Sequence, residues 1–166
     1  MTEDRFIEAV LGMRGKLYRA AMAILWNEQD AADAVQEAML KGWKRRGGLR
    51  DEEAFEVWFM RILVNQCRDA QRRLIRRRKF AQSLKPPAAP AENPDLLEAV
   101  AALPDELRLP VLLYYFDGYS QKETGEILGL TAEQVKGRVR QARDKLRLAL
   151  SDDERKGGGA NGEQGE

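Results

Sequence analysis

Residues 120–150, SQKETGEILGLTAEQVKGRVRQARDKLRLAL, contain the pattern that decides the fold of this chain. Ser120 and Glu123 have the spacing of a capping box, and Gly129 follows an apolar pair where a tight turn between helices favours glycine. A second capping box begins immediately afterwards, at Thr131. Two capped helices around a glycine turn predict a helix-turn-helix.

The second helix of this pair has an apolar face and a basic face. Its apolar residues recur at steps of three and four: Val135, Val139, Ala142, Leu146 and Leu150. Its basic residues are Lys136, Arg140, Arg143 and Arg147. Such a helix packs on its partner while presenting donors to the major groove of DNA, although a solvated basic face would have the same spacing.

Side chains near the start of that helix would enter the groove most deeply. We expect base-edge contacts from Lys136, Arg140 and Gln141. We expect phosphate contacts from Thr131, Arg138 and Arg143.

Residues 83–94, SLKPPAAPAENP, divide the chain, because prolines cannot sustain a helix and small residues cannot build a core. The predicted organisation is a first domain at 1–80, a flexible Pro-rich linker at 81–94, a second domain at 95–150 and a tail at 151–166. The tail has one alanine as its only apolar residue, which predicts disorder.

On both sides of this linker, apolar residues recur with the period of an α-helix. No segment alternates apolar and polar residues as a strand would. We therefore expect an all-α protein of two small helical domains. A first helical stripe comprises Phe6, Val10, Met13, Leu17, Ala20 and Ile24. Asn27 should cap the next helix, which ends near Gly47. A third helix is expected over 53–80, and in the second domain helices are expected over 96–103 and 107–116, the last kinked at Pro110.

A polar, mostly basic stripe follows the third helix at steps of three and four: Arg61, Asn65, Arg68, Arg72, Arg76 and Lys79. Between Arg61 and Lys79 there are eight basic residues and one acid, a density that suits a nucleic-acid backbone. Asn65 differs because an amide can read a base edge. Trp58 and Phe59 could stack on an unpaired base, although both fit the core better.

The second helix has a polar face of another kind, formed by Asp30, Asp33, Gln36, Glu37, Lys41 and Lys44. This acidic face suits a protein partner better than DNA. The alternative of an acid–base site lacks a neighbouring histidine or nucleophile, so no catalytic residue is expected.

The composition argues against several functional classes. The 166 residues include no histidine and one cysteine, Cys67, so we expect no metal, no cofactor and no internal disulfide. The first residues lack signal-peptide features and no long uncharged apolar run occurs, which predicts a soluble cytoplasmic protein without membrane insertion.

Three segments together resemble the extracytoplasmic-function (ECF) sigma factors of the sigma-70 family. The segments are DAADAVQEAMLKGW at 30–43, AFEVWFMRILVNQCRD at 54–69 and LPDELRLPVLLYYFDGYSQKETGEILGLTAEQVKGRVRQARDKL at 103–146. The resemblance implies a non-enzymatic subunit that gives RNA polymerase its promoter specificity, in a stress or envelope response.

The resemblance also implies a role for each surface. The second helix, through Asp30, Asp33, Gln36, Glu37 and Lys41, would dock on the clamp helices of core RNA polymerase. The residues implied in melting and reading the −10 element are Leu49, Arg50, Trp58, Arg61, Asn65, Arg68, Arg72 and Arg76. The helix-turn-helix would read the −35 element as duplex and touch the polymerase flap, and an anti-sigma factor would cover the polymerase-binding surfaces.

Several residues depart from the family pattern, and we expect them at contact positions and not in the core. Leu49, Arg50 and Asp51 stand where many relatives have Phe-Arg-Gly. In the helix-turn-helix, the departures are Thr124, Gly125, Gly137 and Gln141. Glutamine favours adenine where arginine favours guanine, so the −35 preference should differ from that of relatives.

The alternative interpretation is a two-domain regulator that acts without polymerase and uses its first domain for dimerisation. It would require a self-complementary interface and a palindromic DNA site. The sigma-factor interpretation is favoured because it alone accounts for the polar outer face of the second helix.

Overall fold

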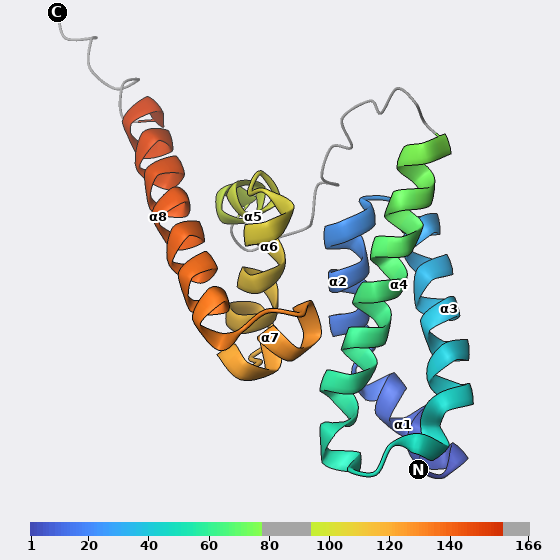
Figure 1. Ribbon diagram of the computed structural model, residues 1–166. Coiled ribbons are helices and arrows are strands. Elements are labelled where there is room, and N and C mark those ends of the chain that lie inside the picture. The colour runs from blue at the N-terminus through green and yellow to red at the C-terminus, as the bar shows by residue number, and fades with distance from the viewer. Residues whose placement is uncertain (78–93, 158–166) are drawn as a thin grey trace, which may run out of the picture.

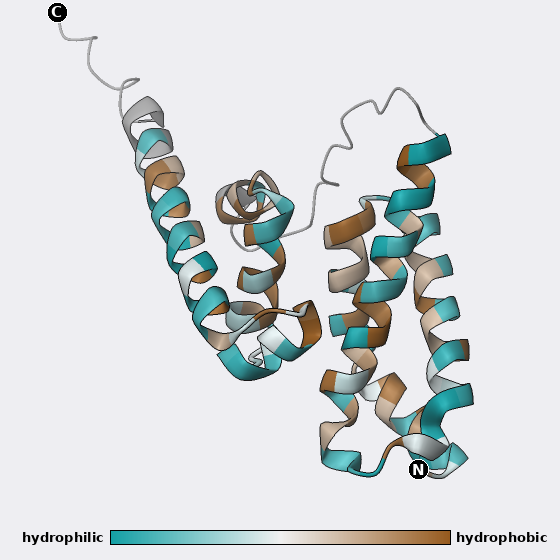
Figure 2. Ribbon diagram, viewed as in Figure 1, coloured by the Kyte–Doolittle hydropathy of each residue, from teal (hydrophilic) through white to brown (hydrophobic). Residues whose placement is uncertain are grey.

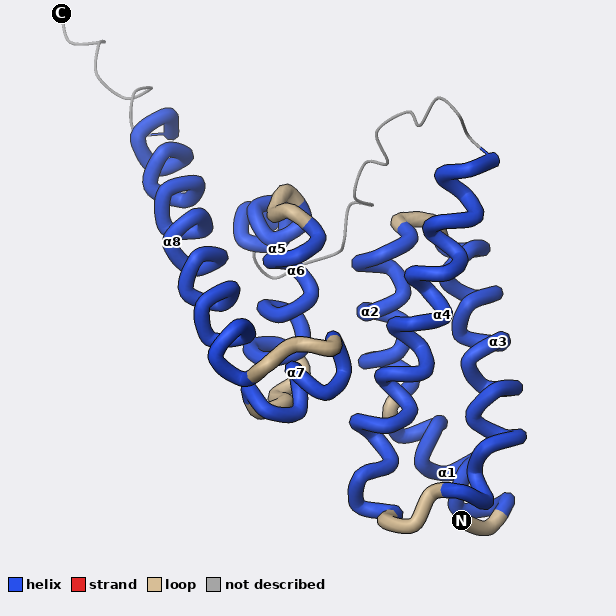
Figure 3. Tube along the Cα trace, viewed as in Figure 1, coloured by secondary structure: helices blue, strands red, loops and turns tan. Residues whose placement is uncertain are grey.

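The computed structural model describes residues 1–77 and 94–157, and within these ranges every regular element is a helix (Figures 1 and 3). The all-α expectation is therefore confirmed. The predicted linker lies outside the described residues except for Pro94, which begins a helix.

The first domain contains four α-helices and two short 3-10 turns. These are α1 (Glu3–Gly12), α2 (Arg14–Leu25), α3 (Glu28–Arg45), η1 (Arg46–Gly48), η2 (Glu52–Ala54) and α4 (Phe55–Arg77). Asn27 caps α3 as predicted, because its side-chain oxygen accepts the Asp30 N–H at 2.9 Å. Helices α2, α3 and α4 pack against one another (Figure 1).

The first apolar stripe is buried throughout, as predicted, but it belongs to two helices instead of one. The helix breaks at Met13, whose backbone leaves the helical region at φ −105° and ψ 9°. Gly12 and Gly15 flank the break, and two glycines weaken a continuous helix. Met13 itself remains in the core, at 1% exposure.

Aromatic rings fill the centre of the first domain. Phe6 packs edge-on against Trp43, Phe55 and Phe59, with centroids 5.5 to 5.9 Å apart. Gly42 of α3 faces this cluster, and a Cβ added there would lie 2.6 Å from Cε2 of Phe59. The glycine therefore permits the close approach of α3 and α4.

A Gly42→Ala variant should lose about 2 kcal/mol of unfolding free energy, because overpacking costs roughly 1–3 kcal/mol and alanine's helix propensity offsets only part of that. Chemical denaturation measures this change. Gly12→Ala is the matched control, since a Cβ there meets no atom within 4 Å. Equal midpoints for the two variants would contradict the steric argument.

The second domain begins with α5 (Pro94–Ala101) and α6 (Asp105–Val111), followed by the wider turn η3 (Leu112–Phe116). The helix expected over 107–116 therefore begins earlier, at Asp105, and continues without a break into the wider turn at Leu112. Pro110 lies in the last turn of α6, and the chain then widens so that the Asp117 N–H reaches the Leu112 carbonyl, five residues back, at 3.0 Å.

The helix-turn-helix is formed by α7 (Gln121–Leu128) and α8 (Ala132–Gly157). Both predicted capping boxes are confirmed: Ser120 with Glu123, and Thr131 with Gln134. Gly129 takes the left-handed conformation at φ 71°, which glycine adopts without strain.

Helix α8 extends to Gly157, so the prediction of a disordered tail from residue 151 is wrong for 151–157. Glu154, Arg155 and Lys156 have good helix propensity, which favours this extension. The Ser151 hydroxyl also donates to the Arg147 carbonyl at 2.7 Å. Residues 158–166 of the predicted tail lie outside the described residues.

The two domains are in direct contact, a placement that the sequence left open. Helix α7 packs against α4, and α6 packs against α2 (Figure 1). The apolar core of the first domain continues into the second through Leu109, Leu113, Tyr119, Ile127 and Leu128. A smaller separate cluster lies between α6 and α8.

Candidate nucleic-acid interface

The basic stripe of α4, defined here as Arg61, Asn65, Arg68, Arg72 and Arg76, runs along one side of the helix as the spacing predicted. Four of its side chains are exposed, and Arg68 is half-buried. Lys79, the last residue of the predicted stripe, lies outside the described residues.

Arg68 points toward the second domain. Its Nη1 donates to the carbonyl oxygen of Leu128, at the end of α7, at 3.4 Å. Burial lowers the pKa of the Arg68 guanidinium, and the positive charges of Arg72 and Arg138 lower it further. Arg138 belongs to α8, so the basic residues of the two domains lie close together at this point.

The remaining contacts of the stripe are weak and local. Arg72 pairs with Asp69 at 2.5 Å, and both side chains are more than half exposed. Arg76 donates to the Arg72 carbonyl at 3.4 Å. Exposed ion pairs contribute about 0–1 kcal/mol, so these arginines are free to turn toward phosphates.

The two aromatic residues that precede the stripe differ in how deeply their side chains are buried. Phe59 is fully buried and belongs to the core. Trp58 is half-buried, with its ring centroid 5.8 Å from that of Phe55, so part of the indole faces solvent. Leu49 is half-buried and Arg50 is exposed, in the connection that leads from η1 toward α4. Trp58, Leu49 and Arg50 therefore lie at the end of α4 where the chain enters the helix.

Helix α8 has the two faces that the spacing predicted. Val135, Val139 and Ala142 are buried. The exposed polar residues are Lys136, Arg140, Gln141 and Arg143, and Figure 2 shows the hydrophilic colouring along this helix. Arg138 is half-buried on the side of the first domain. The Thr131 hydroxyl oxygen accepts the Gln134 N–H at 3.1 Å, so this side chain also caps the helix.

Two of the departures from the family pattern are core residues, contrary to expectation. Thr124 is fully buried, and a Cβ added to Gly125 would lie 2.4 Å from the carbonyl oxygen of Leu130. Glycine at this position lets α7 approach the turn closely. Gly137 and Gln141 are exposed on α8, as expected of contact positions.

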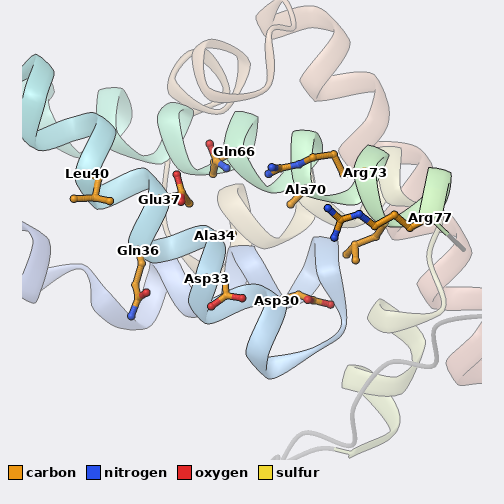
Figure 4. A pocket seen from close by; sticks show the side chains of 11 residues that line it. Asp30, Asp33, Ala34, Gln36, Glu37, Leu40, Gln66, Ala70, Arg73 and Arg77 are labelled. Atoms are coloured by element: carbon orange, nitrogen blue, oxygen red, sulfur yellow. The ribbon is translucent and has the colours of Figure 1, made fainter.

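The polar face of α3 borders a groove of about 400 Å³ between α3 and α4 (Figure 4). From α3 it receives Asp30, Asp33, Gln36, Glu37 and Leu40, and from α4 it receives Gln66, Arg73, Leu74 and Arg77. Sequence reasoning found the acidic side but missed the arginines. Their spacing of four, on a face next to the basic stripe, was the available signal.

Lys41 has a structural role in addition to its predicted one. Its ammonium donates to the side-chain oxygen of Gln66, which is 4% exposed and belongs to α4. The bond ties α3 to α4 beside the groove. Lys41 is therefore not a freely available contact like Asp33 or Glu37, which are exposed.

The described parts of the chain contain no cluster of three or more metal-ligating side chains. In the same ranges, no helix combines the length and the apolar character needed to cross a bilayer.

A basic helix that carries an exposed amide in one domain and a capped helix-turn-helix in the other are typical of a DNA-binding protein of transcription. Models of two families match the chain: Sigma-70 region 2 at residues 10–79 and Sigma-70, region 4 at residues 94–146.

The chain is also similar to known sigma factors. The ECF RNA polymerase sigma factor SigM of Mycobacterium tuberculosis is 31% identical over 149 residues, covering 81% of this chain and 71% of SigM. SigW of Bacillus subtilis, also an ECF sigma factor, is 26% identical and covers 90% and 91%. The sigma factor RpoE of Bartonella quintana, solved with the anti-sigma factor NepR, has the same fold, with a TM-score of 0.75 at 21% identity over 90% of this chain and 98% of RpoE. The chain belongs to the sigma-70 family, within its ECF group.

Proposed function

We propose that this sigma factor directs promoter-specific initiation by recognising two DNA elements, one with each domain. The helix-turn-helix holds the −35 element as duplex, and the basic stripe of α4 captures the unpaired −10 strand. Core polymerase performs the chemistry, and the sigma factor itself is a regulatory subunit. Binding energy opens the duplex, since unstacking costs a few kcal/mol per step and contacts to the strand offset it.

One observation supports this assignment above the others: each basic helix carries an exposed amide among its cations. Asn65 lies between Arg61 and Arg68 on α4, and Gln141 follows Arg140 on α8. Cations alone bind any backbone, whereas an amide pairs with the donor and acceptor edge of a base. Two such helices in one chain suit two separate DNA elements.

The groove between α3 and α4 is the proposed docking site for the clamp helices of core polymerase. Asp33 and Glu37 line one wall and Arg73 and Arg77 line the other, so a helix with both charge signs would be complemented. The exposed Leu40 adds an apolar contact. This arrangement explains why α3 keeps a polar outer face without any DNA contact.

Two further properties are proposed from the family. An anti-sigma factor would hold the protein inactive, as the complex of RpoE with NepR suggests. The site of action would be the cytoplasm, where core polymerase and promoter DNA are found. The domain limits at 1–80 and 95–150 are likewise a proposal, which the family models at 10–79 and 94–146 support.

Run-off transcription with core polymerase tests the proposal. Wild-type protein should give transcripts from defined start sites, and Asn65→Ala should lower the rate of open-complex formation about tenfold, since a base contact is worth roughly 1–3 kcal/mol. Ile75→Ala, at an exposed position of the same helix, should behave as wild type.

The alternative regulator would give a different result in the same assay. It would bind duplex DNA tightly as a dimer and support no polymerase-dependent initiation on any template. That outcome would overturn the sigma-factor mechanism and leave the groove of α3 and α4 without an occupant.

Gly137 yields a second prediction about DNA reading. It is an exposed glycine inside α8, and a Cβ there meets no atom within 4 Å, so nothing within the described protein requires it. Gly137→Ala should raise the unfolding free energy by about 1 kcal/mol. If the helix backbone approaches DNA closely here, the same variant should bind the −35 duplex several-fold more weakly. Thermal denaturation and duplex titration separate the two effects, and tighter binding would exclude a close approach.

A further inference from the structure

The segment that connects α3 to α4, residues 46–54, is tied to α1 at both of its ends. Figure 1 shows α1 beside this connecting segment. At the start of the segment, Nη2 of Arg46 donates to the Glu3 carboxylate at 3.0 Å. At its end, Arg5 faces Glu52, with 3.6 Å between Nε and Oε2. One helix therefore holds the connecting segment on both sides of its middle.

Apolar contacts of α1 support the same two ends. The Phe6 ring lies edge-on to Trp43, which precedes the connecting segment, with centroids 5.5 Å apart. It also lies edge-on to Phe55, which follows the segment, at 5.6 Å. Phe6 is buried, so its side chain is a fixed point of the core that both ends share. The ion pairs of Glu3 and Arg5 extend this packed contact to the surface.

Arg46 is held by three groups at once. Besides its bond to Glu3, the guanidinium donates from Nη1 to the Trp43 carbonyl oxygen at 2.7 Å. It also lies over the Trp43 ring, 3.9 Å from the ring centre. The side chain is only 24% exposed. A guanidinium that is stacked and bonded on two sides is pre-organised, so Arg46 fixes the shape of the connecting segment instead of offering a charge to a phosphate.

The middle of the connecting segment faces solvent. Arg50 and Asp51 are exposed, and Leu49 is half-buried. Gly47 and Gly48 precede them, and glycine loses more backbone freedom on ordering than any other residue. Without external contacts, a segment that begins with two glycines would populate many conformations. The ties to α1 restrict it to one.

These ion pairs contribute little to the stability of the whole protein. Glu3 is 66% exposed and Arg5 is 64% exposed, and water competes for exposed charges. Their effect falls on the connecting segment, because a loop that already has its binding shape pays no ordering cost when a ligand arrives. Loss of the ties should therefore be visible in binding and not in unfolding.

We infer that α1 positions the part of the protein that faces the −10 strand, with Glu3 and Glu52 as positioning residues that hold Leu49 and Arg50 in their binding shape. This inference rests on the proposed function and on the expected contact of Leu49 and Arg50 with the unpaired strand. Glu3 and Glu52 themselves are acidic and would repel a phosphate, so their role differs from that of the basic stripe.

The sign of the effect on DNA binding separates positioning from charge. Glu3→Ala combined with Glu52→Ala removes two negative charges, so electrostatics alone would strengthen the binding of an anionic strand. Loss of the ties should instead weaken that binding about fivefold, because only a fraction of the protein would have the binding shape.

The matched control removes the same charge from the neighbouring positions. Asp4 and Glu53 are exposed and form no ion pair among the described residues. Asp4→Ala combined with Glu53→Ala should therefore bind the strand at least as tightly as wild type. Glu3→Gln should lie between wild type and Glu3→Ala, since its amide oxygen can still accept from Arg46 without carrying a charge.

Binding is measured with the complex of the full chain and core RNA polymerase. The wild-type complex selects the probe from a pool of single-stranded DNA of random sequence, and the enriched strand is then titrated against each variant. A thymidine homopolymer of the same length gives the affinity that is independent of sequence. The double variant Glu3→Ala with Glu52→Ala should lose affinity for the selected strand and keep its affinity for the homopolymer.

Amide hydrogen exchange of the protein alone measures the connecting segment without DNA. The amides of residues 47–51 should exchange faster in the double variant than in wild type, whereas the amides of α4 should exchange at the same rate. Equal thermal midpoints for all variants exclude a general loss of folding as the cause.

The outcomes separate the inference from the proposed function. Unchanged or tighter binding of the selected strand by the double variant would overturn the positioning role, even if exchange is faster. Equal binding by Glu3→Gln and Glu3→Ala would overturn the part assigned to the Arg46 bond. If the wild-type complex enriches no strand from the pool, the proposed function fails and the positioning role fails with it, while hydrogen exchange still decides whether α1 holds the connecting segment.

Discussion

Replacing Lys136 and Arg140 together with alanine should weaken binding to the −35 duplex about 100-fold. Both side chains are exposed near the start of α8, on a different face from the buried Val135 and Val139. A bidentate arginine contact to guanine is worth roughly 1–3 kcal/mol, and a lysine contact adds about 1 kcal/mol more. The double variant should therefore lose most of its discrimination between the promoter and other duplexes.

Duplex titration over a range of salt concentrations measures this prediction. Removing two cations should reduce the slope of log affinity against log salt by about 1.8. The control pair Arg143→Ala with Arg147→Ala removes the same charge further along the same basic face, so its slope should fall similarly while its sequence preference stays intact. Equal loss of preference in both pairs would show that α8 acts only through its charge.

Phe59→Ala should destabilise the first domain by about 3–5 kcal/mol, the cost of emptying a buried aromatic site. Phe59 has no exposed surface, stacks on Phe55 with centroids 5.6 Å apart, and contacts Phe6 edge-on. Because domains of this size have unfolding free energies of about 5–15 kcal/mol, the variant should lose a large share of its stability. Urea denaturation followed by circular dichroism measures the loss.

The neighbouring Trp58 provides the comparison. It is half-buried, so Trp58→Ala should cost less stability than Phe59→Ala and leave the protein folded. If its exposed part stacks on an unpaired base, the variant should lose about 1–3 kcal/mol of affinity for the −10 strand. A Trp58 variant that binds the strand as well as wild type would place this residue in the core alone.

The elements and much of the candidate interface were predictable because their signals are local. Capping boxes, apolar periodicity and the step of the basic stripe each involve residues within one or two helical turns. The predictions were wrong where a second local feature acted against the apolar periodicity. The first apolar stripe predicted one helix, but the glycines on either side of Met13 divide it into two.

The sequence analysis did not predict the groove arginines or the second buried face of α4, because it assigned α4 only one apolar face. Met60 and Val64 lie off the main apolar face, which in retrospect indicates a helix that packs on two sides. Arg108 and Asp117 are charged residues in an apolar setting, and burial of a charge requires a partner that helical periodicity does not reveal.

Local patterns in the sequence were enough to predict the helices, their caps and the basic surfaces. That the domains contact each other, that Arg68 bonds across the contact, and that the Asp117 carboxylate is buried against Arg19 became visible only in the folded protein. The physical reason is distance along the chain. A cap joins residues three apart, whereas the hydrogen bonds that close the domains join residues 34 to 98 apart, and no local pattern encodes which distant partner a buried charge will meet.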